Sequence, residues 1–262
     1  MTVSGRMGVE EHRDWNDVDY SKLMNGRAFP PNFMWGVATA SHQIEGGNTN
    51  NWTRFEPRSK SGQESGDACD HWNRKSQDLE LIKDLNVTHY RFSLEWSRIE
   101  PEMGTWNQDA IDWYSDLVDQ LLHNGIQPMV TLHHFTNPLW WEDLGAFEDE
   151  ANILYWIRFC SKMFEVMSDR VEWWCTINEP AVYASMGYVL GEFPPGERSF
   201  KKTRQVSLNL MRAHARCYRT LKSMEHGGTR KIGLVKNINL FDPYRRWNPL
   251  HRFQAKLLDL SL

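Results

Sequence analysis

The sequence of 262 residues predicts an α/β fold that corresponds to about the first five β/α units of a (β/α)8, or TIM, barrel. Strand-like and helix-like segments alternate along the chain. The strand-like segments are almost continuously apolar, as in parallel strands that helices cover. No Gly-x-Gly-x-x-Gly follows the first strand, so a dinucleotide-binding fold loses its main support. Because five units already use 262 residues, we expect a complete barrel to need considerably more chain.

The individual elements follow from the spacing of apolar residues. Strands are expected at residues 33–38, 88–94, 128–134, 171–178 and 231–238. Helices are expected at residues 76–85, 108–124, 150–168 and 204–224, and a last one begins near Pro249. Residues 41–70 are expected to form a long polar loop, a feature that is often functional. Residues 1–28 lack periodicity, which predicts an N-terminal extension at 1–28 and a barrel portion at 29–262.

Composition narrows the possible functions. The formal net charge is −4, which gives no basic excess for binding nucleic acid, and no apolar run approaches the ~20 residues that span a membrane. The N-terminus is acidic and lacks the apolar core of a signal peptide. The four cysteines form no Cys-x-x-Cys pair, so we expect reduced thiols in a cytoplasmic protein, with no metal and no cofactor. The 13 tryptophans suit sugar stacking or a large apolar core.

Polar side chains follow the predicted strands where active sites of such barrels lie. Gln43 follows the first strand, Arg91 lies in the second, His134 ends the third, and Asn178-Glu179 ends the fourth. We expect these groups to converge on one pocket. Taken alone, His134 fits a structural histidine, Glu179 fits a helix cap or surface carboxylate, and Gln43 has no diagnostic value. An arginine inside a strand is unfavourable unless paired, so Arg91 predicts a nearby carboxylate.

Several ordered motifs resemble one family, glycoside hydrolase family 1, which contains β-glucosidases and β-galactosidases. The matching blocks are 29–40 with Gln43-Ile44-Glu45-Gly46, 90–101, 131–135, Thr176-Ile177-Asn178-Glu179-Pro180 and 191–196. A lone Asn-Glu-Pro is a weak signal, because many sugar-cleaving barrels share it. Five blocks in family order, from about Phe29 to about Pro243, are highly specific.

The resemblance implies a role for each candidate residue in retaining cleavage of β-glycosidic bonds. Glu179 would be the general acid/base, and Gln43 and His134 would bind hydroxyls of the non-reducing sugar. Asn178 would hold the hydroxyl next to the reacting carbon, and Arg91 would sit beside the nucleophile and help to keep it ionised. Phe135 stands where many relatives have Trp, which keeps an apolar wall but removes a ring N–H donor.

The nucleophile that the resemblance implies has no match in these residues. The family carries it in a Thr-Glu-Asn-Gly-type block at the seventh strand, and no Glu-Asn-Gly occurs here. Glu225-His226-Gly227-Gly228 precedes the fifth strand, which places it at the opposite end of the barrel, so we reject it. We therefore expect the isolated chain to be inactive on its β-glycoside substrate.

Two interpretations remain open. In the first, the chain is part of a truncated or split glycosidase. In the second, it is a catalytically inactive half-barrel that binds sugar or a partner. Strands one and five would have unpaired edges, so we expect self-association or binding of a complementary C-terminal half. Retention of Gln43, Arg91, His134, Asn178 and Glu179 favours the first interpretation.

Overall fold

The computed structural model describes residues 29–238 and 240–259. The chain divides into two compact units, 1–34 and 35–262. In the first unit, residues 29–34 contain a turn in which the Phe33 N–H donates to the Pro30 carbonyl at 2.9 Å. The N-terminal extension predicted at residues 1–28 lies outside the described residues. All candidate site residues belong to the second unit.

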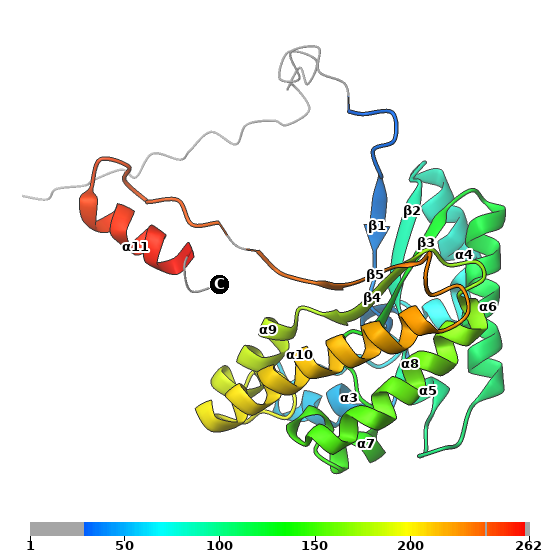
Figure 1. Ribbon diagram of the computed structural model, residues 1–262, viewed down its shortest axis with the longest axis horizontal. Coiled ribbons are helices and arrows are strands. Elements are labelled where there is room, and N and C mark those ends of the chain that lie inside the picture. Colours follow the sequence, from blue (N-terminus) through cyan, green and yellow to red (C-terminus); the bar gives the residue numbers. More distant parts are fainter. Residues whose placement is uncertain (1–28, 239, 260–262) are drawn as a thin grey trace, which may run out of the picture. The chain divides into compact units, whose positions relative to one another are not determined.

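Five strands form one parallel sheet in chain order, which confirms the predicted topology (Figure 1). They are β1 (Gly36–Ala38), β2 (His89–Ser93), β3 (Gln127–His133), β4 (Trp173–Asn178) and β5 (Lys231–Val235). Within the described ranges, β1 pairs only with β2, and β5 pairs only with β4. The sheet is therefore open at both edges, as expected for a partial barrel.

The long helices confirm the predicted strand–helix alternation. They are α4 (His71–Asp84), α6 (Gln108–His123), α8 (Ile153–Met167), α10 (Phe200–Ser223) and α11 (Pro249–Asp259). Helices α4, α6, α8 and α10 contact one another in chain order along one face of the sheet (Figure 1). Helix α10 begins earlier than predicted, because the Ser199 hydroxyl accepts the Lys202 N–H at 3.3 Å and caps the helix there.

Short helices are concentrated in the connections that follow the strands. They are α2 (Ser41–Ile44), α3 (Asn51–Phe55), η2 (Glu56–Arg58), α5 (Trp96–Ile99), α7 (Leu139–Asp143), η3 (Ala146–Glu148), η4 (Glu150–Asn152), α9 (Pro180–Ser185) and the π-helix η5 (Met186–Leu190). The first three lie in the segment predicted as one long loop, so that prediction was incomplete. Asn50 forms a capping box with Thr53, and this reciprocal pair of hydrogen bonds starts α3.

The core lies between the sheet and the helices and is rich in aromatic side chains. Phe92, Val130 and Trp174 pair across β2, β3 and β4 and are all buried. The fully buried side chains include four tryptophans: Trp96, Trp141, Trp156 and Trp174. Part of the tryptophan enrichment therefore serves packing, as the alternative explanation of the composition allowed.

Replacing Trp96 with Ala should lower the free energy of unfolding by about 3–5 kcal/mol, the usual loss for a large aromatic core side chain. Trp96 is 1% exposed, stacks on Phe159 at 4.9 Å between ring centroids, and donates its ring N–H to the buried Glu100 carboxylate at 2.9 Å. Urea unfolding followed by circular dichroism measures the loss. Trp247→Ala is the matched control, since Trp247 is 75% exposed. Equal losses in both variants would contradict the core assignment.

Candidate active site

Glu179 occupies a sharp turn between β4 and α9. Its backbone is left-handed, with φ 44° and ψ 63°, and Pro180 begins the helix directly after it. The Glu179 N–H donates to the Val235 carbonyl of β5 at 2.8 Å, and its carbonyl accepts the Tyr183 N–H at 3.0 Å. Such a backbone costs a non-glycine residue of order 1–3 kcal/mol and is concentrated at functional sites. The side chain is half-buried, and no described residue donates a hydrogen bond to its carboxylate.

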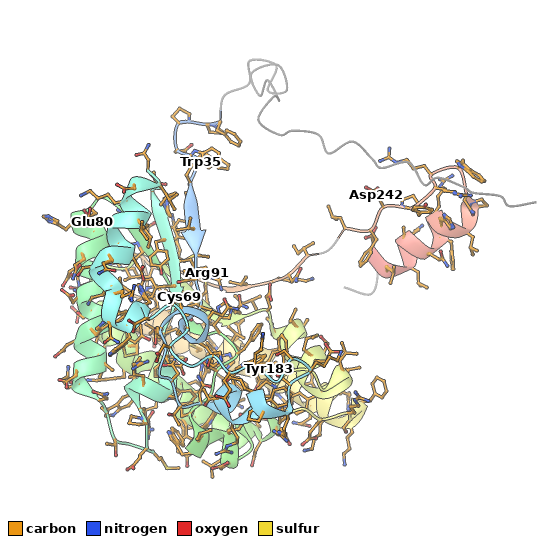
Figure 2. All side chains as sticks on the ribbon, turned by 180° about the vertical axis from the view of Figure 1, so that it is seen from behind. Trp35, Cys69, Glu80, Arg91, Tyr183 and Asp242 are labelled. Atoms are coloured by element: carbon orange, nitrogen blue, oxygen red, sulfur yellow. The ribbon has the colours of Figure 1, made fainter. Side chains whose placement is uncertain are left out.

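Arg91 holds the Asn178 amide beside Glu179. Arg91 lies on β2, and Figure 2 labels it among the side chains of the sheet. Its Nε donates to the Thr131 hydroxyl at 2.8 Å, and a terminal nitrogen donates to Asn178 Oδ1 at 2.6 Å. With Oδ1 engaged by Arg91, the Nδ2 donor of Asn178 is left for another acceptor. Both hydrogen-bond partners of Arg91 are neutral. The carboxylate predicted near Arg91 is thus not supplied by the described residues, and its positive charge is not balanced by an ion pair there.

Gln43 and His134 both line one cleft, which has a volume of about 580 Å³. Gln43 lies on α2 after β1, and His134 directly follows β3. Burial, the Arg91 charge and His133 together lower the pKa of His134 to about 4. The ring is therefore neutral near pH 7 and offers one N–H donor and one acceptor, as hydrogen bonding to hydroxyls requires.

Aromatic rings form one wall of this cleft. Phe135 follows His134, and its ring lies 5.7 Å from Phe193, which in turn lies 4.8 Å from Trp52. Sequence reasoning singled out Phe135 but missed Trp52 and Phe193. The only sequence signal for Trp52 is the length of the 41–70 segment. Phe193 falls within the matching block 191–196, but nothing in that block indicated that its ring lines the cleft, because its position depends on the packing of the loop after η5.

The five predicted residues all come from β2 or from the carboxyl ends of β1, β3 and β4, and they form two neighbouring groups. Arg91, Asn178 and Glu179 make one group, and Gln43 and His134 make the other. The positive charge of Arg91 helps to lower the pKa of His134, so the two groups interact electrostatically. Glu179 does not line the Gln43–His134 cleft. Glu225 is exposed in the turn between α10 and β5, at the amino end of that strand, as predicted.

The described ranges contain no group of three or more His, Cys, Asp or Glu side chains arranged to hold a metal ion. All four cysteines fall within these ranges and are free thiols. None of the described helices is both long and apolar enough to cross a membrane.

The open parallel sheet and its polar carboxyl rim define the chain as part of a glycosidase-type (β/α)8 barrel. A beta-glycosidase from Pyrococcus horikoshii superposes with a TM-score of 0.80 at 41% identity, over 89% of this chain and 54% of that one. The model for Glycosyl hydrolase family 1 matches residues 25–257, and the chain belongs to this family.

The relatives of this chain include β-glucosidases. The chain is 39% identical over 230 residues to Beta-glucosidase A of Thermotoga maritima, covering 84% of this chain and 51% of that protein. It is 40% identical over 210 residues to the human Cytosolic beta-glucosidase, covering 75% of this chain and 45% of that protein. The chain thus spans about half the length of the curated relatives it matches.

Proposed function

We propose that this chain carries the general acid/base and part of the sugar site of a retaining, β-glucosidase-like glycosidase. Glu179 protonates the leaving oxygen in the first step and activates water in the second. Gln43 and His134 bind hydroxyls of the non-reducing sugar, and Asn178 binds the hydroxyl beside the reacting carbon. The Arg91–Asn178–Glu179 arrangement at the end of β4 is the observation that carries the proposal.

In this proposal the second carboxylate, which acts as the nucleophile, is supplied by residues other than these 262. Retaining glycosidases need their two carboxyl groups ~5–5.5 Å apart. Arg91 supports this placement, because its guanidinium has only neutral partners, Thr131 and Asn178, among the described residues. A carboxylate beside it would be kept ionised and nucleophilic by the positive charge. Neither step needs a metal or cofactor.

Hydrolysis of an aryl β-glucoside tests the proposal with two proteins. The chain by itself should give no hydrolysis above the buffer rate, because the nucleophile is missing. A chimera, in which residues 29–257 replace the matching half of Thermotoga maritima Beta-glucosidase A, should be active. Hydrolysis by the chain alone that Glu179→Gln abolishes would contradict our account of the nucleophile. A chimera that unfolds cooperatively but remains inactive would contradict the role of this half.

A second candidate function is association with a polypeptide that completes the sheet, without catalysis by this chain. The observation in its favour is the open edge of β5. A cleft of about 560 Å³ lies beside this edge, and Met129, Trp173 and Lys231 are among the residues that line it. The two candidate functions predict different results for the chimera. If this half is only structural, the Glu179→Gln substitution should leave the hydrolysis rate of the chimera unchanged.

The proposal includes a cytoplasmic location. Two observations support it: the four cysteines are free, and one relative is the human Cytosolic beta-glucosidase. The substrate class that we propose is a β-glucoside, on the basis of the relatives' activities.

A further inference from the structure

Asn51 joins two connections that are far apart in the sequence. It is the first residue of α3, in the segment after β1, and it is only 2% exposed. Its side-chain amide donates to the Phe135 carbonyl at 3.2 Å, and its Oδ1 accepts the Asn137 N–H at 2.8 Å. Its backbone N–H donates to the Asn137 carbonyl at 3.0 Å. One buried residue thus holds, through both its side chain and its backbone, the turn that directly follows His134.

This turn needs support, because its backbone is unfavourable by itself. Phe135 has φ 71°, in the left-handed region that a bulky side chain rarely adopts. The Asn137 side chain is also held, since its Oδ1 accepts from His133 Nε2 at 2.9 Å and its Nδ2 donates to Glu142 at 2.7 Å. The Phe135 ring packs edge-to-face on the His134 ring, with 5.2 Å between the centroids. The conformation of the turn therefore determines how the His134 ring is packed.

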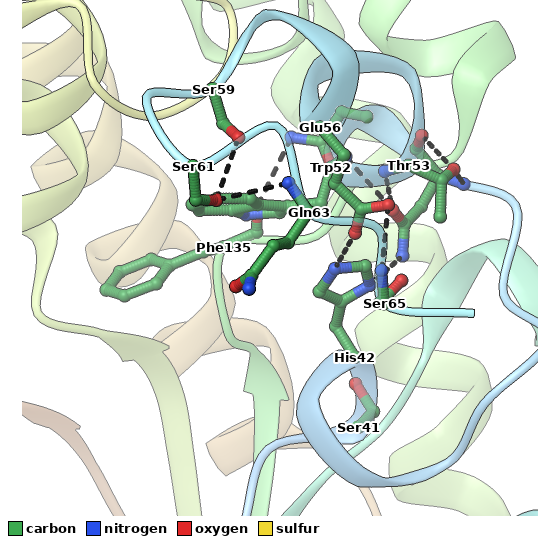
Figure 3. Close-up of polar contacts among 12 residues, drawn as sticks. Ser41, His42, Trp52, Thr53, Glu56, Ser59, Ser61, Gln63, Ser65 and Phe135 are labelled. Atoms are coloured by element: carbon green, nitrogen blue, oxygen red, sulfur yellow. Dashed lines mark hydrogen bonds and ion pairs between the residues drawn. The ribbon is translucent and has the colours of Figure 1, made fainter. Parts of the chain in front are cut away.

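The preceding residue, Asn50, connects the same segment to α2, which carries Gln43. Asn50 is fully buried, and its Oδ1 caps α3 by accepting the Trp52 N–H at 3.0 Å. Its Nδ2 is then the donor to His42 Nδ1, at 3.2 Å. The other ring nitrogen of His42, Nε2, carries the proton and donates to Glu56 Oε1 at 3.0 Å (Figure 3). Because His42 immediately precedes Gln43, the start of α3 is also tied to the helix that carries Gln43.

The two residues proposed to bind the sugar hydroxyls thus lie on separate connections that meet at one buried pair of residues. Gln43 follows β1, and His134 follows β3. We propose that Asn51 is a positioning residue of the sugar site, which fixes His134 relative to the segment that also holds Gln43. Asn51 acts through the turn after His134 and does not contact the substrate, because its side chain is buried against that turn. This inference rests on the proposed function, from which the sugar-binding roles of Gln43 and His134 are taken.

A positioning role and a purely stabilising role predict different behaviour of His134. Burial, followed by the nearby Arg91 and His133, lowers the pKa of His134 to about 4. If Asn51 holds the turn against the His134 ring, its loss should admit water to the ring and raise that pKa. If Asn51 only adds stability to the fold, the pKa of His134 should be the same in any variant that still folds.

NMR titration of the full chain with isotope-labelled histidine measures this pKa, and the His134→Gln variant assigns the signal. In Asn51→Ala the pKa of His134 should rise by about one pH unit or more, because the ring becomes hydrated. Asn51→Ser is the second variant, since its hydroxyl is too short to bridge both backbone groups of the turn, and it should give a rise as well. Asn73→Ala is the matched control, at an exposed position on α4, and should leave the pKa unchanged.

Kinetics of the chimera connect the position of His134 to the sugar. Asn51→Ser should lower kcat/KM for an aryl β-glucoside about tenfold or more, as a misplaced binding group does. In a His134→Ala background the same substitution should have little further effect, because it acts through that side chain. Asn73→Ala should leave kcat/KM close to that of the unsubstituted chimera.

The outcomes separate this inference from the proposed function. The inference is overturned if the pKa of His134 is unchanged in the folded Asn51 variants, or if Asn51→Ser lowers kcat/KM equally with and without His134. It is overturned as well if Asn51→Ser leaves kcat/KM unchanged, or if neither Asn51 variant folds, since Asn51 would then serve folding alone. The proposed function stands in each of these cases. A chimera that stays fully active after His134→Ala contradicts the proposed sugar-binding role of His134, whatever the pKa shift.

Discussion

Glu179→Gln should lower kcat/KM of the chimera about 10²–10⁴-fold, the range that general acid–base groups usually contribute. Glutamine keeps the size of the side chain and can still accept a hydrogen bond, but it cannot transfer a proton. The loss should be larger for an aryl β-glucoside with a poor leaving group than for a nitrophenyl β-glucoside, since a good leaving group needs little protonation. Steady-state kinetics with both substrates measure the difference.

This dependence on the leaving group separates proton transfer from a structural effect. A variant that merely distorts the turn at Glu179 should lose activity equally on both substrates. Glu172→Gln is the matched control, because Glu172 immediately precedes β4 at its amino end and pairs with Lys231 on the surface. It should leave the kinetics close to those of the unsubstituted chimera. An equal loss on both substrates in Glu179→Gln would contradict a general acid.

The long elements were predictable because each combines an apolar period with a clear terminator. Helix α6 begins at the Asn107 cap and ends before Gly125, which has φ 75°, and both signals are present in the sequence. The short helices α3 and η2 lack such periodicity. Their positions follow from the Asn50 cap and from tertiary contacts, such as the Asn51 N–H donating to the Asn137 carbonyl at 3.0 Å. A contact over such a sequence separation leaves no local pattern to detect.

The candidate site was predictable to the extent that barrel topology brings the carboxyl ends of strands together. The hydrogen-bond partners of the individual site residues were not predictable from the sequence. Arg91 reaches Asn178 across β3 because β2, β3 and β4 pair in parallel register, and that register is a property of the whole sheet. The division into two groups was also not foreseen, since it depends on α2 placing Gln43 in a cleft that Glu179 does not line.

The buried carboxyl of Glu45 should make the stability of the chain fall as the pH rises from 4.5 towards 8. Glu45 is 2% exposed and accepts the Tyr114 hydroxyl at 2.5 Å, while Arg98 lies 3.4 Å away. Glu95, fully buried, donates its N–H to the same Tyr114 oxygen at 2.9 Å. Burial, and then the charge of Glu95, raises the pKa of Glu45 from 4.5 to about 8.

The sign of the effect follows from proton linkage. Between pH 4.5 and pH 8 the folded chain keeps a proton on Glu45 that the unfolded chain releases, so raising the pH favours unfolding. At about 1.4 kcal/mol for each pH unit, the loss from this group is up to about 5 kcal/mol and is complete above the folded pKa. Burial lowers the pKa values of His133 and His134 to about 4, which opposes this trend in the acidic part of the range.

A comparison of variants isolates Glu45 from the histidines. The difference in unfolding free energy between Glu45→Gln and the unsubstituted chain should shift in favour of the variant by several kcal/mol from pH 5 to pH 8, because glutamine does not titrate. Urea unfolding at a series of pH values measures it. Glu80→Gln, on the exposed side of α4, should show no such shift, since the Glu80 side chain is 67% exposed. Parallel pH curves for Glu45→Gln and the unsubstituted chain would mean that the carboxylate is already ionised in the fold. Arg98 would then have to balance both buried carboxylates, Glu45 and Glu95, in a site that water does not reach.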